Sequence, residues 1–217
     1  MPTNKPQKNV RRTNVYVDSW NLYYGCLRDT PHRWINVAEL VRLSMPDTYR
    51  INRIRFFTAR VQARANDPQG PVRQEMLFRA MQTLPNLTMH YGNFLMKRFW
   101  AHLITPLPDG TKFAHVEKPE EKGSDVNIAT HLLVDAFDKD FDAAVVISDD
   151  SDLVEPIDIV RRKLGLHVTV LSPRGKSREL SKVATRFRPI DQAILGSCQF
   201  PTTLTDANGT FKKPDAW

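Results

Sequence analysis

Five consecutive apolar residues, 143–147, run directly into Ser148 and the carboxylates Asp149, Asp150 and Asp152. An apolar run of this length that is rich in β-branched residues predicts an interior strand of a parallel sheet, whose two faces are both covered by helices. The carboxylates then lie at the carboxyl end of the strand, which is the edge where open α/β sheets bind ligands. The pattern therefore predicts an acidic site at one edge of a sheet.

Strand and helix patterns alternate along most of the chain. Short β-rich segments are followed by longer segments with an apolar residue every three to four positions. The expected strands are residues 13–18, 51–61, 87–93, 143–148 and 167–171. The expected helices are residues 21–27, 36–44, 71–84, 152–164 and 177–184, with a further helix that starts at Ser124. This order predicts an α/β fold, a three-layer α/β/α sandwich with a mainly parallel sheet.

One insertion and both ends of the chain depart from this alternation. Within residues 94–117, the Pro-Asp-Gly segment at 108–110 lies between apolar stretches and predicts an inserted β-hairpin beside the sheet. Residues 1–10 are basic and rich in Lys, Asn and Pro, and residues 199–217 show little periodicity, so both are expected to be flexible tails. We therefore expect one folded domain, residues 11–198.

Composition narrows the classes of function. A hydrophobic content of 41% is compatible with a packed core, and no apolar run approaches the ~20 residues of a membrane helix. The N-terminal residues lack the apolar stretch of a secretory signal, so a cytoplasmic location is expected. Cys26 and Cys198 have no metal-ligand spacing, which argues against a disulfide framework and a structural zinc site. The net charge of +7 favours a polyanionic partner such as nucleic acid, although a charge that only maintains solubility is an equal alternative.

Two further segments bring acids to the same predicted edge. Residues 13–18 end in Asp18, and Asp125 lies in the first turn of the helix that starts at Ser124. Each acid alone could cap a helix or lie at the positive end of its dipole. Capping needs only one acceptor, however, whereas several carboxylates at one edge favour a shared hard cation such as Mg²⁺ or Mn²⁺. Because the dinucleotide, P-loop and acyl-transfer glycine motifs are missing from the sequence, the chemistry that remains is metal-assisted attack of water on a phosphoester.

Basic residues are candidates for phosphate contacts. The predicted hairpin interleaves cations and aromatic rings in Lys97, Arg98 and Trp100, a pattern that suits phosphates and unpaired bases. The alternative is a half-buried strand whose aromatic side chains pack inward. Four further candidates lie near the predicted acidic edge, namely Lys122, Arg174, Lys176 and Arg178. For the last three, a solvated basic surface is an equal alternative.

Three motifs follow one another along the chain: Val-Tyr-Val-Asp-Ser-Trp-Asn at 15–21, Glu-Lys-Gly-Ser-Asp-Val-Asn at 121–127 and Val-Ile-Ser-Asp-Asp-Ser-Asp-Leu at 146–153. In this order they resemble the NYN domain family, a branch of the PIN-like nucleases, and in particular its LabA-like bacterial members. The resemblance implies a Rossmann-like sandwich that cuts RNA with Mg²⁺ or Mn²⁺. It also implies a catalytic set in which four acids hold the metal and one asparagine supports them: Asp18, Asn21, Asp125, Asp150 and Asp152.

Two residues depart from the family pattern. Asp149 stands where many relatives have Gly or Asn, and it is an additional candidate ligand. His131 stands where many relatives have a further Asp, and it either assists proton transfer or has a structural role. Ser148 is expected to form a hydrogen bond with an acidic neighbour.

The leading hypothesis is a metal-dependent endoribonuclease in which a Mg²⁺- or Mn²⁺-activated water cleaves RNA phosphodiester bonds. The expected partner is RNA, either single-stranded or structured with unpaired regions. The alternative is an RNA-binding regulatory module of the same fold that cleaves weakly or not at all, and a phosphatase for small phosphate esters is a third option. The sequence leaves open the target RNA, the tolerance of DNA, the number of metal ions and a homodimer.

Overall fold

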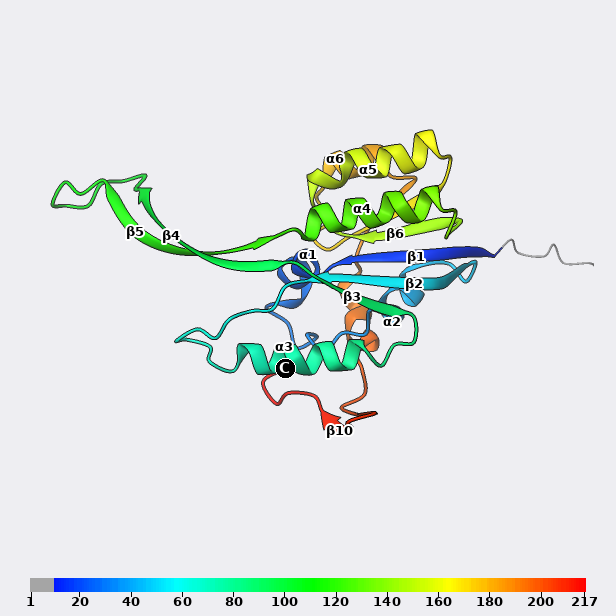
Figure 1. Ribbon diagram of the computed structural model, residues 1–217, viewed down its shortest axis with the longest axis horizontal. Helices are drawn as coiled ribbons and strands as arrows, with labels where there is room; N and C mark the ends of the chain where they lie inside the picture. Colours follow the sequence, from blue (N-terminus) through cyan, green and yellow to red (C-terminus); the bar gives the residue numbers. More distant parts are fainter. Residues whose placement is uncertain (1–9) are drawn as a thin grey trace, which may run out of the picture.

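A six-stranded parallel sheet forms the centre of the protein in a computed structural model that describes residues 10–217 (Figure 1). Its strands are β1 Arg11–Asp18, β2 Tyr49–Thr58, β3 Leu87–Tyr91, β6 Ala143–Ile147, β7 His167–Ser172 and β8 Arg186–Pro189. They lie side by side in the order β3-β2-β1-β6-β7-β8, and every pair is parallel. The strand order therefore reverses between the central strands β1 and β6, the kind of position where α/β sheets bind ligands.

Helices cover both faces of the sheet. The α-helices are α1 Ser19–Leu22, α2 Val37–Ser44, α3 Gly70–Met81, α4 Ser124–Phe137, α5 Val154–Asp158 and α6 Arg178–Val183. Shorter turns are η1 Tyr23–Leu27, η2 Ser151–Leu153, η3 Ile159–Lys163 and η4 Gln192–Cys198. Helices α2 and α3 lie on one face, and α4, α5 and α6 lie on the other (Figure 1). This arrangement confirms the predicted α/β/α sandwich.

The strands at the centre of the sheet are buried on both faces. Val15 and Val17 of β1 pack into the core beneath α2 and α3, whereas Tyr16 packs into the core beneath α4. In β6, Val145 and Val146 alternate in the same way. Because helices cover both faces, apolar side chains are needed on both sides of these strands, and each large side chain that is fully buried contributes about 1.5–3 kcal/mol.

The predicted hairpin is present as β4 Asn93–His102 and β5 Phe113–Lys122, which pair antiparallel. It extends well beyond the edge of the sandwich as an arm (Figure 1). The arm returns directly into α4 through Gly123, whose φ of 98° lies in the left-handed region that favours glycine. The junction thus places the start of α4 directly after the base of the arm.

The C-terminal residues are part of the fold, which corrects the expected flexible tail at 199–217. The strands β9 Thr203–Asp206 and β10 Gly209–Lys212 form a second hairpin. Phe200 and Phe211 are buried in the core, and Arg79 of α3 makes two hydrogen bonds of 2.6 and 2.7 Å to Asp206. These contacts hold the segment in place. The expected N-terminal tail, residues 1–10, lies outside the described residues except for Val10.

Across residues 10–217, no helix combines the length and the apolar character that crossing a membrane requires.

Candidate active site

Asp18 and Ser148 leave the sheet side by side at the carboxyl ends of the two central strands. In the β1–β6 pair, Val17 lies opposite Ile147, so the residues that follow are neighbours. Ser148 Oγ donates a hydrogen bond to Asp18 Oδ2 over 2.9 Å, as expected for a serine beside an acid. The parallel pairing thus joins two segments that are 130 residues apart in the sequence.

Asp18 is a buried carboxylate, with 2% of its surface exposed. It caps α1, because the Asn21 backbone N–H donates to Oδ1 over 3.0 Å and the Asn21 side-chain amide donates to Oδ2 over 2.6 Å. Burial raises the pKa of Asp18 and the nearby charge of Asp150 raises it further, while the hydrogen bonds from Asn21 and Ser148 lower it. A buried carboxylate of this kind is stabilised by a cation that replaces the lost water.

Asp150 is the second acid at this edge. Its backbone N–H donates to Ser148 Oγ over 3.0 Å, so Ser148 connects the Asp150 backbone to the Asp18 carboxylate. The Asp150 side chain caps η2 by accepting a hydrogen bond from Asp152 N–H over 2.9 Å. The same carboxylate therefore caps a helical turn and adds negative charge to the surroundings of Asp18.

Asp149 turns toward β7 and the loop that follows it. Asp149 Oδ1 accepts a hydrogen bond from Ser172 Oγ, and Oδ2 accepts one from Arg174 N–H over 2.7 Å. Ser172 Oγ also accepts a hydrogen bond from Gly175 N–H over 2.7 Å. Since both carboxylate oxygens hold this loop, the structure does not bring Asp149 to Asp18 as the additional ligand that was considered.

The four predicted metal-binding acids do not form one compact cluster. Asp125 is half-buried in the first turn of α4, and Asp152 is exposed on η2. Although α4 packs against η2, no three or more of the His, Cys, Asp and Glu side chains that the structure describes come together closely enough to hold a metal ion. This corrects the expectation of a preassembled four-acid site. Carboxylates repel one another, so a closer approach requires a cation between them.

The donors that do meet at this edge suit a hard divalent cation. The Asp18 and Asp150 carboxylates and the Ser148 hydroxyl all present oxygen, which is the donor type that Mg²⁺ and Mn²⁺ prefer. Proteins commonly hold Mg²⁺ with one or two carboxylates, together with water and substrate phosphate. Two carboxylates at the edge therefore fit such an ion, with Asp125 and Asp152 on the adjacent elements α4 and η2.

The predicted basic residues that follow β7 lie at the same carboxyl edge. Arg174, Lys176 and Arg178 are exposed on the loop and helix after β7, and Asp149 holds the start of this loop. Lys122 is also exposed, at the end of β5, and its Nζ lies 4.0 Å from a Glu120 carboxylate oxygen. The edge that carries Asp18 therefore has cations on its β7 side.

The arm exposes its aromatic residues and pairs its cations. Trp100 is 68% exposed, and its ring lies 5.2 Å from that of His115 on the facing strand. Lys97 forms an ion pair with Glu120, and Arg98 lies 3.7 Å from Glu117. The alternative in which the aromatic side chains pack inward therefore does not hold for Trp100, while the two cations are partly neutralised by β5.

His131 lies in a partly buried polar network on the α4 face of the sheet. Its ring is 4.3 Å from that of His90 and 5.8 Å from that of Phe57. His90 Nε2 lies 3.2 Å from Arg55 Nη1, and Arg55 makes two hydrogen bonds of 2.7 Å to Asp135. Burial and the charge of Arg55 lower the pKa of His131, which favours the neutral ring. These contacts support the structural role of His131 rather than the proposed role in proton transfer.

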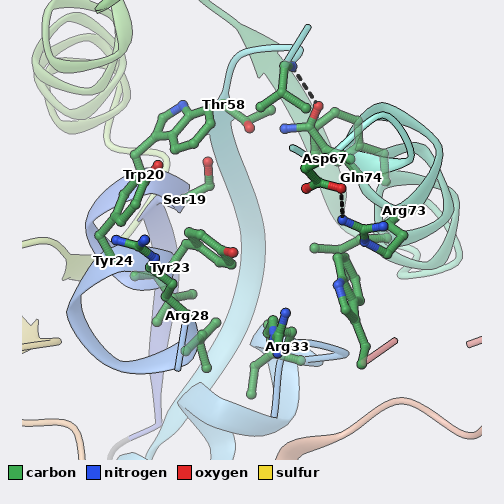
Figure 2. A pocket seen from close by; sticks show the side chains of 18 of the residues that line it. Ser19, Trp20, Tyr23, Tyr24, Arg28, Arg33, Thr58, Asp67, Arg73 and Gln74 are labelled. Atoms are coloured by element: carbon green, nitrogen blue, oxygen red, sulfur yellow. Dashed lines mark hydrogen bonds and ion pairs between the residues drawn. The ribbon is translucent and has the colours of Figure 1, made fainter. Parts of the chain in front are cut away.

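A pocket of about 320 Å³ lies beside the acidic edge, and the sequence patterns did not reveal it (Figure 2). Ser19, which follows Asp18 directly, lines this pocket, as do residues of η1, the end of β2 and α3. Asp18 and Asn21 do not line it. No single motif could have predicted the pocket, because its residues come from segments between Ser19 and Trp217 that meet only in the folded chain.

Three comparisons with known proteins bear on this site and its fold. Residues 12–191 match the NYN domain family. The chain is 27% identical over 237 residues to the Pseudomonas putida protein named 6-hydroxy-3-succinoylpyridine 3-monooxygenase HspA, a match that covers 95% of this chain and 75% of that protein. The fold of the present chain is similar to that in the crystal structure of a protein of unknown function from Vibrio parahaemolyticus. The TM-score is 0.54 and the identity 17%, over 86% of this chain and 97% of that one.

Proposed function

The chain belongs to the NYN domain family, and from this premise we propose that it is a metal-dependent endoribonuclease. The family is generally one of nucleases, so membership by itself indicates a nuclease-type function. Metal dependence and cleavage of RNA are the finer parts of the proposal. The observation that carries the finer proposal is the buried carboxylate of Asp18, held by Asn21 and Ser148 beside Asp150, at the point where the strand order reverses. This is an oxygen-rich, negatively charged site of the kind that binds Mg²⁺ or Mn²⁺.

In this proposal Asp18 and Asp150 hold the ion, and Asp125 and Asp152 support it from α4 and η2. When bound, such an ion lowers the pKa of a coordinated water and stabilises negative charge on a phosphoryl group. Asn21 and Ser148 keep the Asp18 carboxylate oriented, and their hydrogen bonds favour its charged form.

Charge and exposed aromatic rings support RNA as the substrate. The net charge of +7 attracts a polyanion, and the cations after β7 lie at the acidic edge. Trp100 on the arm offers an exposed ring on which an unpaired base can stack. RNA that is single-stranded, or structured with unpaired regions, is therefore the proposed partner, and the cytoplasm is the proposed location.

Two other functions remain as alternatives. The absence of a preassembled group of three acids in the described part of the chain favours an RNA-binding regulatory module with little turnover. The name of the Pseudomonas relative describes a reaction on a small pyridine compound, and the pocket beside Asp18 is lined by aromatic rings and arginines. A small aromatic substrate is thus a second candidate.

The test is cleavage of a single-stranded RNA oligonucleotide in Mg²⁺, in Mn²⁺ and in chelator. We expect ion-dependent cleavage that falls by about a hundredfold or more in Asp18→Asn and in Asp150→Asn, because metal stabilisation of the transition state is worth several kcal/mol. The matched control is Asp138→Asn, which changes an exposed aspartate at the end of α4 and should cleave like the wild type. Cleavage that survives both site substitutions contradicts the proposal, and RNA binding without turnover in either ion favours the regulatory module.

A further inference from the structure

The pocket beside the acidic edge has a positively charged lining. We call it the arginine pocket, because four of the described residues that line it are arginines: Arg28, Arg33, Arg64 and Arg73. Of the described residues that line the pocket, one is acidic: Asp67, which forms an ion pair with Arg73. The arrangement leaves an excess of positive charge inside a concave site, which favours an anionic ligand.

Arg33 is placed to contact such a ligand. Its Nε donates a hydrogen bond to the Thr30 carbonyl oxygen over 3.1 Å, which holds the side chain in place. Figure 2 shows Arg33 at the lower end of the pocket. Arg28 lies on the η1 side of the pocket with its guanidinium 5.5 Å from the centre of the Tyr24 ring. A planar guanidinium is well suited to bind phosphate or carboxylate.

Aromatic rings form the wall next to these arginines. The rings of Trp20 and Tyr24 are stacked, 5.8 Å apart, and Tyr23 packs edge-on against Tyr24 at 5.1 Å. Tyr23 directs its hydroxyl toward the pocket, and Ser19 lies above it (Figure 2). Flat rings beside guanidinium groups suit a ligand that is itself an aromatic ring bearing a negative charge.

The arginine pocket and the acidic edge share one segment of the chain. The α1–η1 segment presents Asn21 to Asp18 and presents Tyr23 and Tyr24 to the pocket. A Cβ atom at Gly25 would lie only 2.4 Å from the Cβ of Pro173, so η1 packs closely against the loop after β7. Ser19 follows Asp18 directly and lines the pocket, so the acidic edge and the pocket are adjacent.

We propose that the arginine pocket binds one nucleotide of the RNA strand, with the base against the aromatic wall and the phosphate at Arg33, while Arg28 adds positive charge from the η1 side of the pocket. This inference rests on the proposed nuclease function and adds the contact that positions the strand. The volume of about 320 Å³ is at the small end of ligand sites, so it suits a single nucleotide rather than a longer segment. A small aromatic acid has the same combination of a flat ring and a negative charge, and the titrations below distinguish it from a nucleotide.

The test is calorimetric titration of the full chain, in chelator, with AMP and UMP. Uridine lacks the charge and ribose 5-phosphate lacks the ring, so both should bind at least about tenfold more weakly than the nucleotides, since each loses a charge-assisted or a stacking contact. Pyridine-3-carboxylate is the probe for a small aromatic acid. Tighter binding of this acid than of either nucleotide overturns the assignment to RNA, as does a failure of both nucleotides to bind.

Substitutions locate the binding. The double variant Arg28→Gln with Arg33→Gln should bind AMP and UMP at least about tenfold more weakly, as expected for the loss of hydrogen bonds from charged donors. The matched control is Arg162→Gln, an exposed arginine on the opposite face of the sheet, which should bind like the wild type. The single variant Arg28→Gln, whose side chain is 59% exposed, provides a second substitution that should leave folding intact. Wild-type affinity in both Arg28 variants overturns the proposal.

Asp18→Asn separates this inference from the proposed function. We expect this variant to lose RNA cleavage and to keep nucleotide binding in chelator. Nucleotide binding without any cleavage by the wild type would refute the nuclease and leave the pocket assignment standing. Cleavage without nucleotide binding would refute the pocket assignment alone.

Discussion

Ser148 donates a hydrogen bond of 2.9 Å to the Asp18 carboxylate, and its hydroxyl oxygen accepts one of 3.0 Å from the Asp150 backbone. All of these contacts lie where β1 and β6 end, and Ser148 is fully buried. One hydroxyl therefore connects two acids that come from separate strands. This contact makes the ends of the two central strands into a single site.

Ser148→Ala should destabilise the protein by about 1–3 kcal/mol, because the substitution leaves a buried carboxylate with one hydrogen-bond donor fewer. The loss should be largest at neutral pH and should shrink as Asp18 takes up a proton at low pH, since the hydroxyl stabilises the charged form. Urea unfolding at several pH values measures this. Ser151→Ala removes a nearby exposed hydroxyl and is the control; an equal loss in both variants would argue against the Ser148 bond.

Asp150→Asn should raise the thermal midpoint of the protein in chelator. Burial and the charge of Asp150 raise the pKa of Asp18 above its unfolded value of about 4. The folded protein therefore loses stability as the pH rises from about 4 through the raised pKa of Asp18. Asparagine keeps the cap on η2 and removes one negative charge. The gain should therefore be present at pH 7 and absent below about pH 4.

The same variant should also show a smaller stabilisation by Mg²⁺, because it removes a ligand from the folded state. Thermal unfolding with and without Mg²⁺ measures both effects. Asp138→Asn is again the control. Identical Mg²⁺ shifts in the wild type and Asp150→Asn would show that Asp150 does not contribute to binding the ion.

His90 should make the fold sensitive to mild acid. Burial lowers the pKa of His90 to about 4, with further contributions from His131 and Arg55. A histidine whose folded pKa is depressed contributes stability above its unfolded pKa of about 6.5, and this contribution is lost as the pH falls toward 4. His90→Gln keeps an acceptor for Arg55 and does not titrate, so its thermal midpoint should decrease less between pH 7 and pH 5 than that of the wild type. An equal decrease in both proteins would show that protonation of His90 does not cause the loss of stability in mild acid.

Trp100→Ala should weaken RNA binding about tenfold without changing the thermal midpoint. Stacking of a base on an aromatic side chain is worth about 1–3 kcal/mol, whereas an exposed tryptophan contributes little to folding. Binding of an unpaired RNA oligonucleotide in chelator measures the affinity. Ile104→Ala removes a fully exposed aliphatic residue from the same arm and is the control. Equal losses in both variants would indicate apolar contact rather than stacking.

Most of the sheet and the arm could be predicted from local patterns. The run that became β6 is continuously apolar, and β1 and β7 are rich in buried β-branched residues, because the folded sheet buries both faces of these strands. The missed elements carry weaker signals: β8 is a short segment, Arg186–Pro189, that becomes a strand through its pairing with β7. The C-terminal hairpin depends in the same way on burial of Phe211 and on the ion pair between Arg79 and Asp206.

The acidic edge was also predictable, because parallel strands end at the same edge of a sheet. Sequence could not decide which carboxylates meet there. Successive side chains of an extended segment point to opposite sides, so Asp149 reaches Ser172 whereas Asp150 lies beside Asp18. The arginine pocket likewise requires segments from Ser19 to Trp217 to pack together. Secondary structure depends on neighbouring residues, but the convergence of side chains depends on strand order and packing, which exist only in the complete fold.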